Sequence, residues 1–575
     1  MGFEGYTEKR WKENIFLLFL FIGLIFLSFF FLKTKSGLAT EERAAYSLAN
    51  TFDNAGVSHL ASREPEKNFN DAAVPELINN YYTFRKTSFS FLPQETISSS
   101  NNYLWHSSKY YTNYLITEEN GGFDYSSVIE NCNINGAAPL YYLVFHTVSS
   151  MFPFYSIKYV GFALNLFCVL GIFFVIFYIC RKHLFSIPAG FAACILFCFS
   201  IGNISAILCT QNYLMTILFM LLSCSLHLNL LHDDEDNVWN LRFLVLVTIL
   251  GILTDYQFLA FALVEGILYI IAMLCFNHYK NILQYLIGML ISDIIAFALF
   301  PAIFSHISIY IRDFLSVLQA NALSHTFIPY LKAIQNYLLI PGNLCFAFLF
   351  LLMIVCMLAL VLNPHPFSLH LSNFKKRVAN MEIDDIFLIL LFIIYAGLLI
   401  LFQITCSIKT FLGLLPLAAI LICYFLYRFC YVFMRSNIQI GLFIGAIVSI
   451  VCFLSLFYYE PDFLQKENKE TIMLANTYMS TPCIFIENTD TDVYDYLLEL
   501  GIHKKSRRIK GNDTSTLKND EVVKNSKQLI LYLNNQTNSD AVIDDLLSYG
   551  KYAFSKRLYQ ANQMSGDLKV YLLYR

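Results

Sequence analysis

Two neighbouring glutamates, Glu41 and Glu42, follow closely after the first long apolar run of the sequence. If that run crosses a bilayer, a carboxylate at this place lies near the membrane surface, where it can take a proton from an attacking hydroxyl group. Such a pair is also typical of an acidic cap on a short helix, because negative side chains are favourable at a helix N-terminus. The two residues alone favour the cap, so a base role for Glu41 depends on other motifs.

Other candidate binding groups are polar residues at the ends of apolar runs or inside them. Asp255 lies at the outer end of one run, where we expect it to face a cleft, whereas Glu265 and Asp293 lie deeper. Carboxylates inside a membrane are costly and usually face a cavity or a partner. We expect Glu265 and Asp293 to be protonated or paired groups that serve the fold.

A substrate that carries a phosphate needs cations nearby. Lys409, Arg312 and Lys332 are the candidates on the predicted outer face. Long basic side chains also extend to the membrane boundary where no ligand is bound. Their residue type alone therefore does not identify a phosphate site.

Two segments resemble the signature regions of bacterial membrane glycosyltransferases of the GT-C type, which include protein O-mannosyltransferases and aminoarabinose transferase. The first is Thr40-Glu-Glu-Arg-Ala-Ala-Tyr-Ser-Leu-Ala-Asn50, in which Glu41 and Glu42 match the family's Asp-Glu pair. The second ends in Asn135-Gly-Ala-Ala-Pro-Leu-Tyr-Tyr-Leu-Val-Phe-His146, and its Pro-Leu-Tyr-Tyr block is the most specific part. Segments around Gln211, Asp255 and Lys409 follow in the family's order, so the resemblance covers most of the chain.

The resemblance implies transfer of a sugar from a polyprenyl-phosphate donor to a glycan, lipid or protein acceptor at the outer membrane face, with inversion. It implies that Glu41 is the catalytic base and that Lys409 contacts the phosphate. The remaining substrate-binding residues that it implies are Glu42, Asn135, Tyr141, Gln211 and Asp255. The sequence predicts no cofactor and no metal ligand, and it leaves dependence on a divalent metal open.

Several motif positions differ from the family pattern. The family's Asp is Asn135, its His is Ala137, an Arg appears as Gln211, and a later His is Asp255. Asn135 can still form hydrogen bonds to a sugar, but it cannot take up a proton. A second interpretation is therefore a catalytically degenerate relative that binds a lipid-linked glycan or scaffolds a partner enzyme. A transporter is a third, although the sequence shows no inverted repeat and the polar regions lie on one side.

The elements that must position these residues are membrane helices. The chain has 575 residues, of which 57% are hydrophobic and 14% charged, with a mean hydropathy of +0.54. Soluble domains average about 25% charged residues, and a bilayer core needs roughly 20 apolar residues per helix. We predict an all-α polytopic bundle of about eleven spans: 14–32, 157–180, 185–203, 212–232, 240–254, 256–276, 281–304, 343–363, 385–403, 411–433 and 438–458.

The first run is too long for a signal peptide, so we expect a permanent anchor. A further run, 138–152, is short and polar, and we expect it to enter the interface without crossing. Lys and Arg are enriched in short cytoplasmic loops, and with eleven spans most of these residues lie inside. This predicts a cell-membrane protein with a cytoplasmic N-terminus and an extracytoplasmic C-terminal domain.

Four regions follow from these boundaries. They are 1–33 with the first span, 34–156 as an outer loop domain with juxtamembrane helices, 157–458 as the membrane domain, and 459–575 as a small outer α/β domain. In the last region, residues 483–487, 529–533 and 568–574 are predicted strands, and 493–500 and 541–548 are predicted helices. The basic run from His503 to Lys510 is of a kind that can attract anionic lipid or polymer, but it is more typical of a solvated loop, which we expect here.

Cysteines and net charge exclude other classes. Nearly all of the 15 cysteines lie in apolar runs, where they act as small hydrophobic residues. No CxxC or Cys/His spacing predicts a disulfide framework or a zinc site. The net charge of −3 gives no support for nucleic-acid binding, so the expected partners are lipid, the lipid-linked donor and the acceptor.

Overall fold

The computed structural model divides into two compact units, which are described separately. The membrane unit contains residues 1–32 and 162–462, and the outer unit contains residues 33–161 and 463–575. The residues that the structure describes are 3–50, 105–108, 111, 115, 122–152, 157–232, 237–304, 307, 335–339, 383–402, 413–433, 436–464, 468–487, 496–510, 514–534, 539–560 and 568–575.

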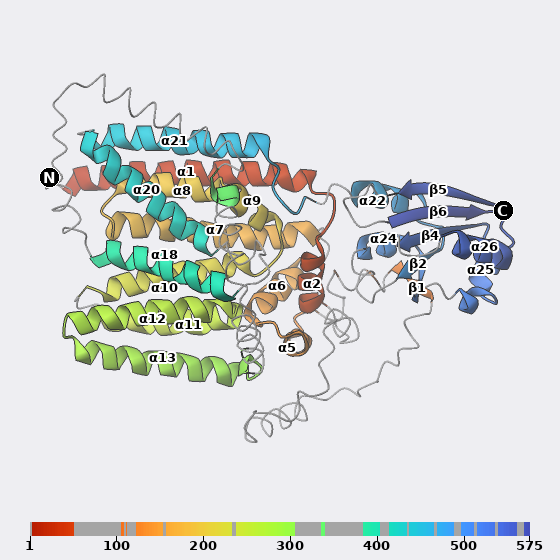
Figure 1. The fold of residues 1–575 in the computed structure, drawn as a ribbon, viewed down its shortest axis with the longest axis horizontal. Helices are drawn as coiled ribbons and strands as arrows, with labels where there is room; N and C mark the ends of the chain where they lie inside the picture. The colour runs from red at the N-terminus through yellow and green to blue at the C-terminus, as the bar shows by residue number, and fades with distance from the viewer. Residues whose placement is uncertain are drawn as a thin grey trace. The chain divides into compact units, whose positions relative to one another are not determined.

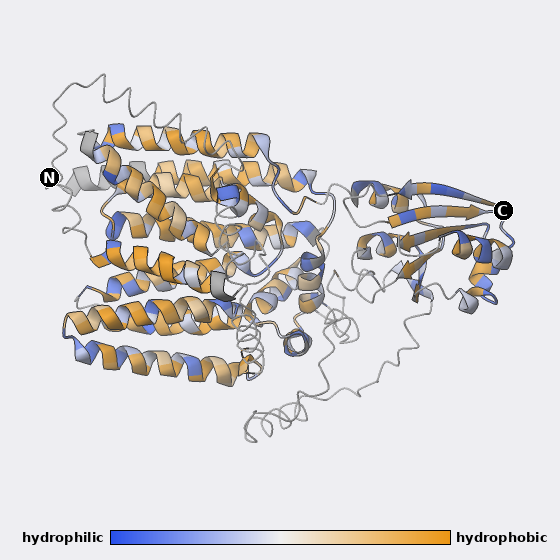
Figure 2. Cartoon of the chain, viewed as in Figure 1, coloured by the Kyte–Doolittle hydropathy of each residue, from blue (hydrophilic) through white to orange (hydrophobic). Residues whose placement is uncertain are grey.

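Long apolar helices make up the membrane unit (Figure 1). Figure 2 shows that these helices are hydrophobic along most of their length. Their bounds are α1 Phe3–Thr34, α7 Ile157–Lys182, α8 Ile187–Cys198, α9 Ile201–Leu208, α10 Tyr213–Leu230, α11 Asn237–Thr254, α12 Gln257–Cys275, α13 Tyr279–Leu299, α18 Ile383–Phe402, α20 Leu414–Phe433 and α21 Asn437–Tyr458.

Ten of the eleven predicted spans coincide with these helices, and the eleventh, 343–363, lies outside the described residues. Within the described part, seven helices are long and apolar enough to cross a membrane, or eight if α8 and α9 form one broken span. The chain is thus a membrane protein, and the predicted helical bundle with a small C-terminal sheet domain is confirmed. Helix α11 is shorter, with an apolar stretch over Val238–Thr254.

The predicted span 185–203 is bent rather than straight. Helices α8 and α9 meet at an angle of 53° around Phe199 and Ser200. Ser200 takes an extended backbone, and its hydroxyl accepts the amide N–H of Asn203, which caps the start of α9. The carbonyls at the other end of α9 are satisfied by Asn165, whose amide donates to the oxygens of Ala206, Ile207 and Cys209. This pairing satisfies carbonyl groups that the end of the helix leaves without partners.

The outer unit contains short helices and one six-stranded sheet. The helices of its N-terminal segment are α2 Thr40–Asn50, α5 Tyr125–Asn135 and α6 Leu140–Met151. Helix α6 covers the run that was expected not to cross. Its 12 residues extend about 18 Å, which is less than the roughly 30 Å of a bilayer core.

The sheet has the strand order β1-β3-β2-β4-β6-β5, where β3, β2 and β4 are parallel and the other neighbours antiparallel. The strands are β1 Trp105–Ser107, β2 Cys483–Glu487, β3 Lys505–Lys510, β4 Gln528–Asn534, β5 Phe554–Gln560 and β6 Leu568–Tyr574. The helices of this part are α22 Asn468–Thr477, α24 Leu497–Ile502, α25 Glu521–Asn525 and α26 Ser539–Gly550. Alternate residues of β2 and β4 pack on α26, with Ile484, Leu531 and Leu546 in one buried cluster.

The predicted strands β2, β4 and β6 and the helix α26 are present. The helix predicted over 493–500 begins at Leu497 in the described residues, and 493–495 lie outside them. The solvated loop predicted for the basic run is wrong, because Lys505–Lys510 forms strand β3 inside the sheet, between β1 and β2. Its charges are accommodated there: Arg508 is buried, and Arg507 forms an ion pair with Asp520.

The two polar regions predicted as separate domains are grouped in one unit. Strand β1 comes from the first region and pairs with β3 from the last, with Trp105 opposite Arg507. The indole Nε1–H of Trp105 also donates to Asp520 Oδ2 at 2.7 Å. Asp520 in turn caps α25 by accepting the amide N–H groups of Val522 and Val523. Strand pairing and the Asp520 carboxylate therefore both join the two regions.

Candidate active site

Glu42 is fixed inside the outer unit by both of its carboxylate oxygens. Oε1 lies 2.5 Å from Lys35 Nζ, and Oε2 accepts the backbone N–H of Ala39 at 2.8 Å. The side chains of Lys35 and Glu42 are 1% and 0% exposed. The bond to Ala39, three residues earlier, is the backward half of a capping box and defines the start of α2.

Neighbouring side chains strengthen the segment that precedes α2. Arg43 donates through Nε to the carbonyl oxygen of Leu38 at 2.8 Å, and Lys158 Nζ donates to the carbonyl oxygen of Lys35 at 3.2 Å. Glu41 is the next residue on the same first turn and is half-buried. The two glutamates thus occupy different environments, and only Glu42 is fully enclosed.

Helices α5 and α6 pack against α2 and carry the second predicted motif (Figure 1). They are joined at Gly136, which has a φ of 72° and returns its N–H to the carbonyl oxygen of Cys132. This left-handed conformation is favourable for glycine, because it has no Cβ. Asn131 then donates its amide to the carbonyl oxygen of Leu48 at 3.2 Å, which links α5 to α2.

Tyr141 and Asn135 take different places in this three-helix cluster. Tyr141 is fully buried and stacks on Phe145 at 6.1 Å between ring centroids. Phe145 in turn meets Tyr46 of α2 edge to face at 4.9 Å, so the Tyr141 ring contributes to helix packing. Asn135 is half-buried at the end of α5, and its amide donates to the carbonyl oxygen of Asn131 at 3.4 Å.

His146 is a titratable residue of the cluster. Sequence analysis placed it in a polar run but assigned it no role. It is buried on α6, where its ring meets Tyr125 at 5.7 Å and its Nε2 lies 3.4 Å from Ser150 Oγ. Burial lowers the pKa of His146, and a backbone hydrogen bond with Ala49 and the charge of Asp124 oppose this shift. Its place on α6, four residues from Tyr142, could have been found from the helical spacing of buried residues.

Two predicted substrate-binding residues, Gln211 and Asp255, belong to the membrane unit and lie close together in it. Asp255 accepts the side-chain amide of Asn212 at 3.0 Å and the backbone N–H of Gln257 at 2.9 Å. It thereby connects the start of α10 with the start of α12. Burial raises the pKa of Asp255 to about 6, and these two hydrogen bonds oppose the shift. Gln211, next to Asn212, is buried.

The other expected groups are distributed as follows. Lys409, Arg312 and Lys332 lie outside the described residues. Glu265 is fully buried, accepts the Ser223 hydroxyl, and lies 3.3 Å from His227 Nδ1, which agrees with a paired structural group. Asp293 is half-buried on α13. The structure therefore joins Glu41 and Glu42 with the motif of α5 and α6 in one unit, and Asp255 with the Gln211 segment in the other.

No protein-family model and no curated protein matches the sequence. Solved structures similar to it include two of one protein. ArnT from Cupriavidus metallidurans in the apo state has a TM-score of 0.43 and 9% identity, and the match covers 80% of this chain and 94% of that chain. ArnT from the same organism bound to undecaprenyl phosphate has a TM-score of 0.43 and 10% identity, with the same coverage. Similarity at this level does not assign the chain to a family.

Proposed function

We propose that the protein is a membrane glycosyltransferase that moves a sugar from a polyprenyl-phosphate donor to a glycan, lipid or protein acceptor at the outer membrane face. Glu41 is the general base that takes the proton of the acceptor hydroxyl. The acceptor oxygen then attacks the sugar carbon, and the polyprenyl phosphate leaves. A base at the membrane boundary suits this donor, because its lipid tail stays in the bilayer while its reacting carbon lies at the interface.

The single observation that carries the proposal is that Glu42 is fully buried and bonded through both oxygens, whereas Glu41 is half-buried. Both oxygens of Glu42 are engaged, one by Lys35 and one by Ala39. A carboxylate that is bonded in this way and fully buried positions the turn and is not accessible to an acceptor hydroxyl. Glu41 stands beside it on the same turn, and α2 packs on the helices of the second motif. Glu42 is therefore a positioning residue, and Glu41 is assigned the proton transfer.

The remaining predicted residues, apart from Tyr141, are proposed substrate contacts. In the outer unit this is Asn135, which is half-buried and offers an amide to sugar hydroxyls; Tyr141 is fully buried, so it supports the cluster behind the contact residues. In the membrane unit they are Gln211 and Asp255. Lys409 is proposed to neutralise the donor phosphate, since charge-assisted hydrogen bonds to phosphate are among the strong ones.

The proposal is tested by sugar transfer or hydrolysis with purified full-length protein and a radiolabelled polyprenyl-phosphate sugar. Glu41→Gln keeps the shape of the side chain but cannot take up a proton. We expect it to lower turnover by roughly 10²–10⁴, the usual contribution of a general base, while donor binding and thermal stability stay near those of the parent. A parent that turns over and a Glu41→Gln variant that matches it would exclude Glu41 as the base.

Glu130→Gln is the matched control. Glu130 is an exposed carboxylate on α5 in the same unit, so its loss is expected to leave turnover unchanged. A comparable decrease in both variants would point to a general charge effect and not to proton transfer at Glu41.

The second candidate is a binding function without catalysis, and the amide of Asn135 is the specific reason to keep it. Its amide donates to the carbonyl of Asn131, and it stands where the resembling enzymes carry a carboxylate. A protein that only binds would retain the donor and show no turnover with any polyprenyl-phosphate sugar. If the parent is inactive and Asn135→Asp combined with Ala137→His does not create activity, the binding function replaces the transferase.

A further inference from the structure

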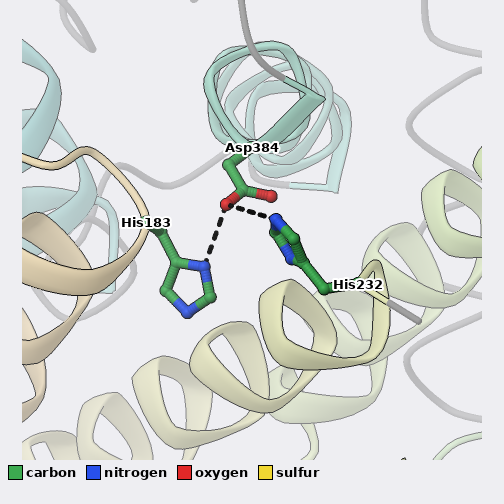
Figure 3. Close-up of side chains that lie close together, drawn as sticks. All are labelled: His183, His232 and Asp384. Atoms are coloured by element: carbon green, nitrogen blue, oxygen red, sulfur yellow. Dashed lines mark hydrogen bonds and ion pairs between the residues drawn. The ribbon is translucent and has the colours of Figure 1, made fainter. Parts of the chain in front are cut away.

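Two histidines and an aspartate from three separate helix ends meet in the membrane unit (Figure 3). His183 follows the end of α7, His232 follows the end of α10, and Asp384 stands in the first turn of α18. His183 Nδ1 lies 2.9 Å from Asp384 Oδ2, and His232 Nε2 lies 3.7 Å from the same oxygen. The described part of the chain contains no second group of this kind.

The neighbouring carboxylate shows what is unusual about Asp384. Asp385 is also buried, but it has a cation: Arg428 lies 3.1 Å away, and the hydroxyl of Tyr424 donates at 2.9 Å. Among the described residues, the ion-pair partners of Asp384 are the two imidazoles, and its Oδ1 has no hydrogen-bond partner there. A buried carboxylate without a compensating charge is expensive. A positive charge is therefore needed between Asp384 and the two rings.

The hydrogen bonds of the histidines indicate how that charge is supplied. His232 Nδ1 lies 3.0 Å from the carbonyl oxygen of Leu228, which fixes the proton on Nδ1 and leaves the lone pair of Nε2 directed at Asp384. A histidine that binds a metal through one ring nitrogen usually donates the N–H of its other ring nitrogen to a carboxylate or a backbone carbonyl. His183 is 2% exposed, and its Nε2 also has no hydrogen-bond partner among the described residues.

We propose that His183, His232 and Asp384 bind one divalent first-row transition metal ion such as Zn²⁺. The ligand atoms are Nδ1 of His183, Nε2 of His232 and a carboxylate oxygen of Asp384, and a fourth position remains for water. Zn–N and Zn–O bonds of about 2.0–2.1 Å in a tetrahedron place ligand atoms about 3.3 Å apart. The separations of 2.9 and 3.7 Å bracket that value, and all three atoms lie within 4.8 Å of one another.

A small movement completes the site. The His232 side chain is 45% exposed, so its ring has room to move toward the other two ligands. The bound ion would join α7, α10 and α18, whose cluster residues are separated in sequence by long stretches of chain. By the distribution of Lys and Arg, these helix ends lie on the cytoplasmic side. The site is independent of the proposed transfer reaction.

The test uses full-length protein in detergent with any affinity tag removed, stripped with a chelator and then dialysed against a trace of ZnCl₂. We expect about one equivalent of zinc per chain by elemental analysis. Addition of Co²⁺ should give the absorption of a four-coordinate nitrogen and oxygen site. His232→Gln should lower zinc affinity at least tenfold and abolish this absorption, and because His232 is half-exposed the variant should still fold. Asp384→Asn should do the same.

Two controls separate this site from general cation binding. His278→Gln removes a histidine between α12 and α13, outside the cluster, and should retain the full equivalent of zinc. Asp234→Asn combined with Glu235→Gln changes the acidic run that follows His232 in the sequence and should also retain it. Zinc bound equally by the parent and His232→Gln, or no zinc bound by the folded parent, would overturn the proposal.

Discussion

Replacement of Lys35 by methionine tests whether Glu42 has the structural role assigned to it. The Lys35–Glu42 pair is buried, with an Nζ–Oε1 distance of 2.5 Å. Removing one partner of a buried pair leaves an uncompensated charge and typically costs about 3–5 kcal/mol. The outer unit has about 240 residues, and at this size each kcal/mol corresponds to roughly 2–4 °C in Tm. Lys35→Met should therefore lower the Tm by about 6–20 °C.

The double variant Lys35→Met/Glu42→Gln distinguishes an ion pair from simple packing. It removes both charges, and the Gln oxygen can still accept the N–H of Ala39, so most of the lost stability should return. Lys33→Met is the control: Lys33 is exposed, and its replacement should shift the Tm by no more than about 2 °C.

Thermal unfolding of the purified variants, followed by intrinsic fluorescence, measures these effects. A loss below about 1 kcal/mol for Lys35→Met would be the size of a surface pair and would refute the argument from burial. A double variant as unstable as the single one would show that the aliphatic stem of Lys35, and not its charge, supports the turn.

Two further outcomes concern the sheet. Trp105→Phe removes the indole donor to Asp520 and should lower the unfolding free energy by about 1.5–3 kcal/mol. Tyr549→Phe leaves that hydrogen bond intact and should change the unfolding free energy little. Denaturant titrations of both variants measure the difference. His503 is buried with Nε2 2.8 Å from the Tyr532 hydroxyl, and burial lowers its pKa against two backbone hydrogen bonds. The unfolded chain therefore binds the proton more readily, so stability should fall as pH decreases below about 6.5, and His503→Gln should lose this slope; an unchanged slope would contradict the assignment.

The sequence predicted those parts of the fold in which a local pattern determines the structure. Apolar runs of about 20 residues favour membrane helices, so ten of the predicted spans coincide with helices in the described residues, with nearly correct ends. Strands β2, β4 and β6 were found for a related reason, because alternating or continuous Ile, Leu and Val residues on central strands pack on a helix. Leu529–Leu533 is an example.

The sequence failed where distant contacts determine the structure. The charges of Lys505–Lys510 indicated a loop, but the pairing with β1 and β2 stabilises a strand there. The edge strand β5 is largely exposed and carries polar residues, so it lacked an apolar signal. The pairs Lys35–Glu42 and Trp105–Asp520 depend on packing that no spacing rule describes. The same holds for the cluster around Asp384, which three separate helix ends bring together.

The pairing of β1 with β3 has a consequence for the path of the chain. Two strands that share hydrogen bonds must be in the same compartment, and one of them precedes α7 while the other follows α21. The number of membrane crossings from α7 to α21, with both helices counted, must therefore be even. The ten spans predicted for that stretch meet this parity. Any revision of their number must add or remove crossings in twos, so a short helix such as α11 cannot be reassigned to the interface alone. A second segment would have to change with it.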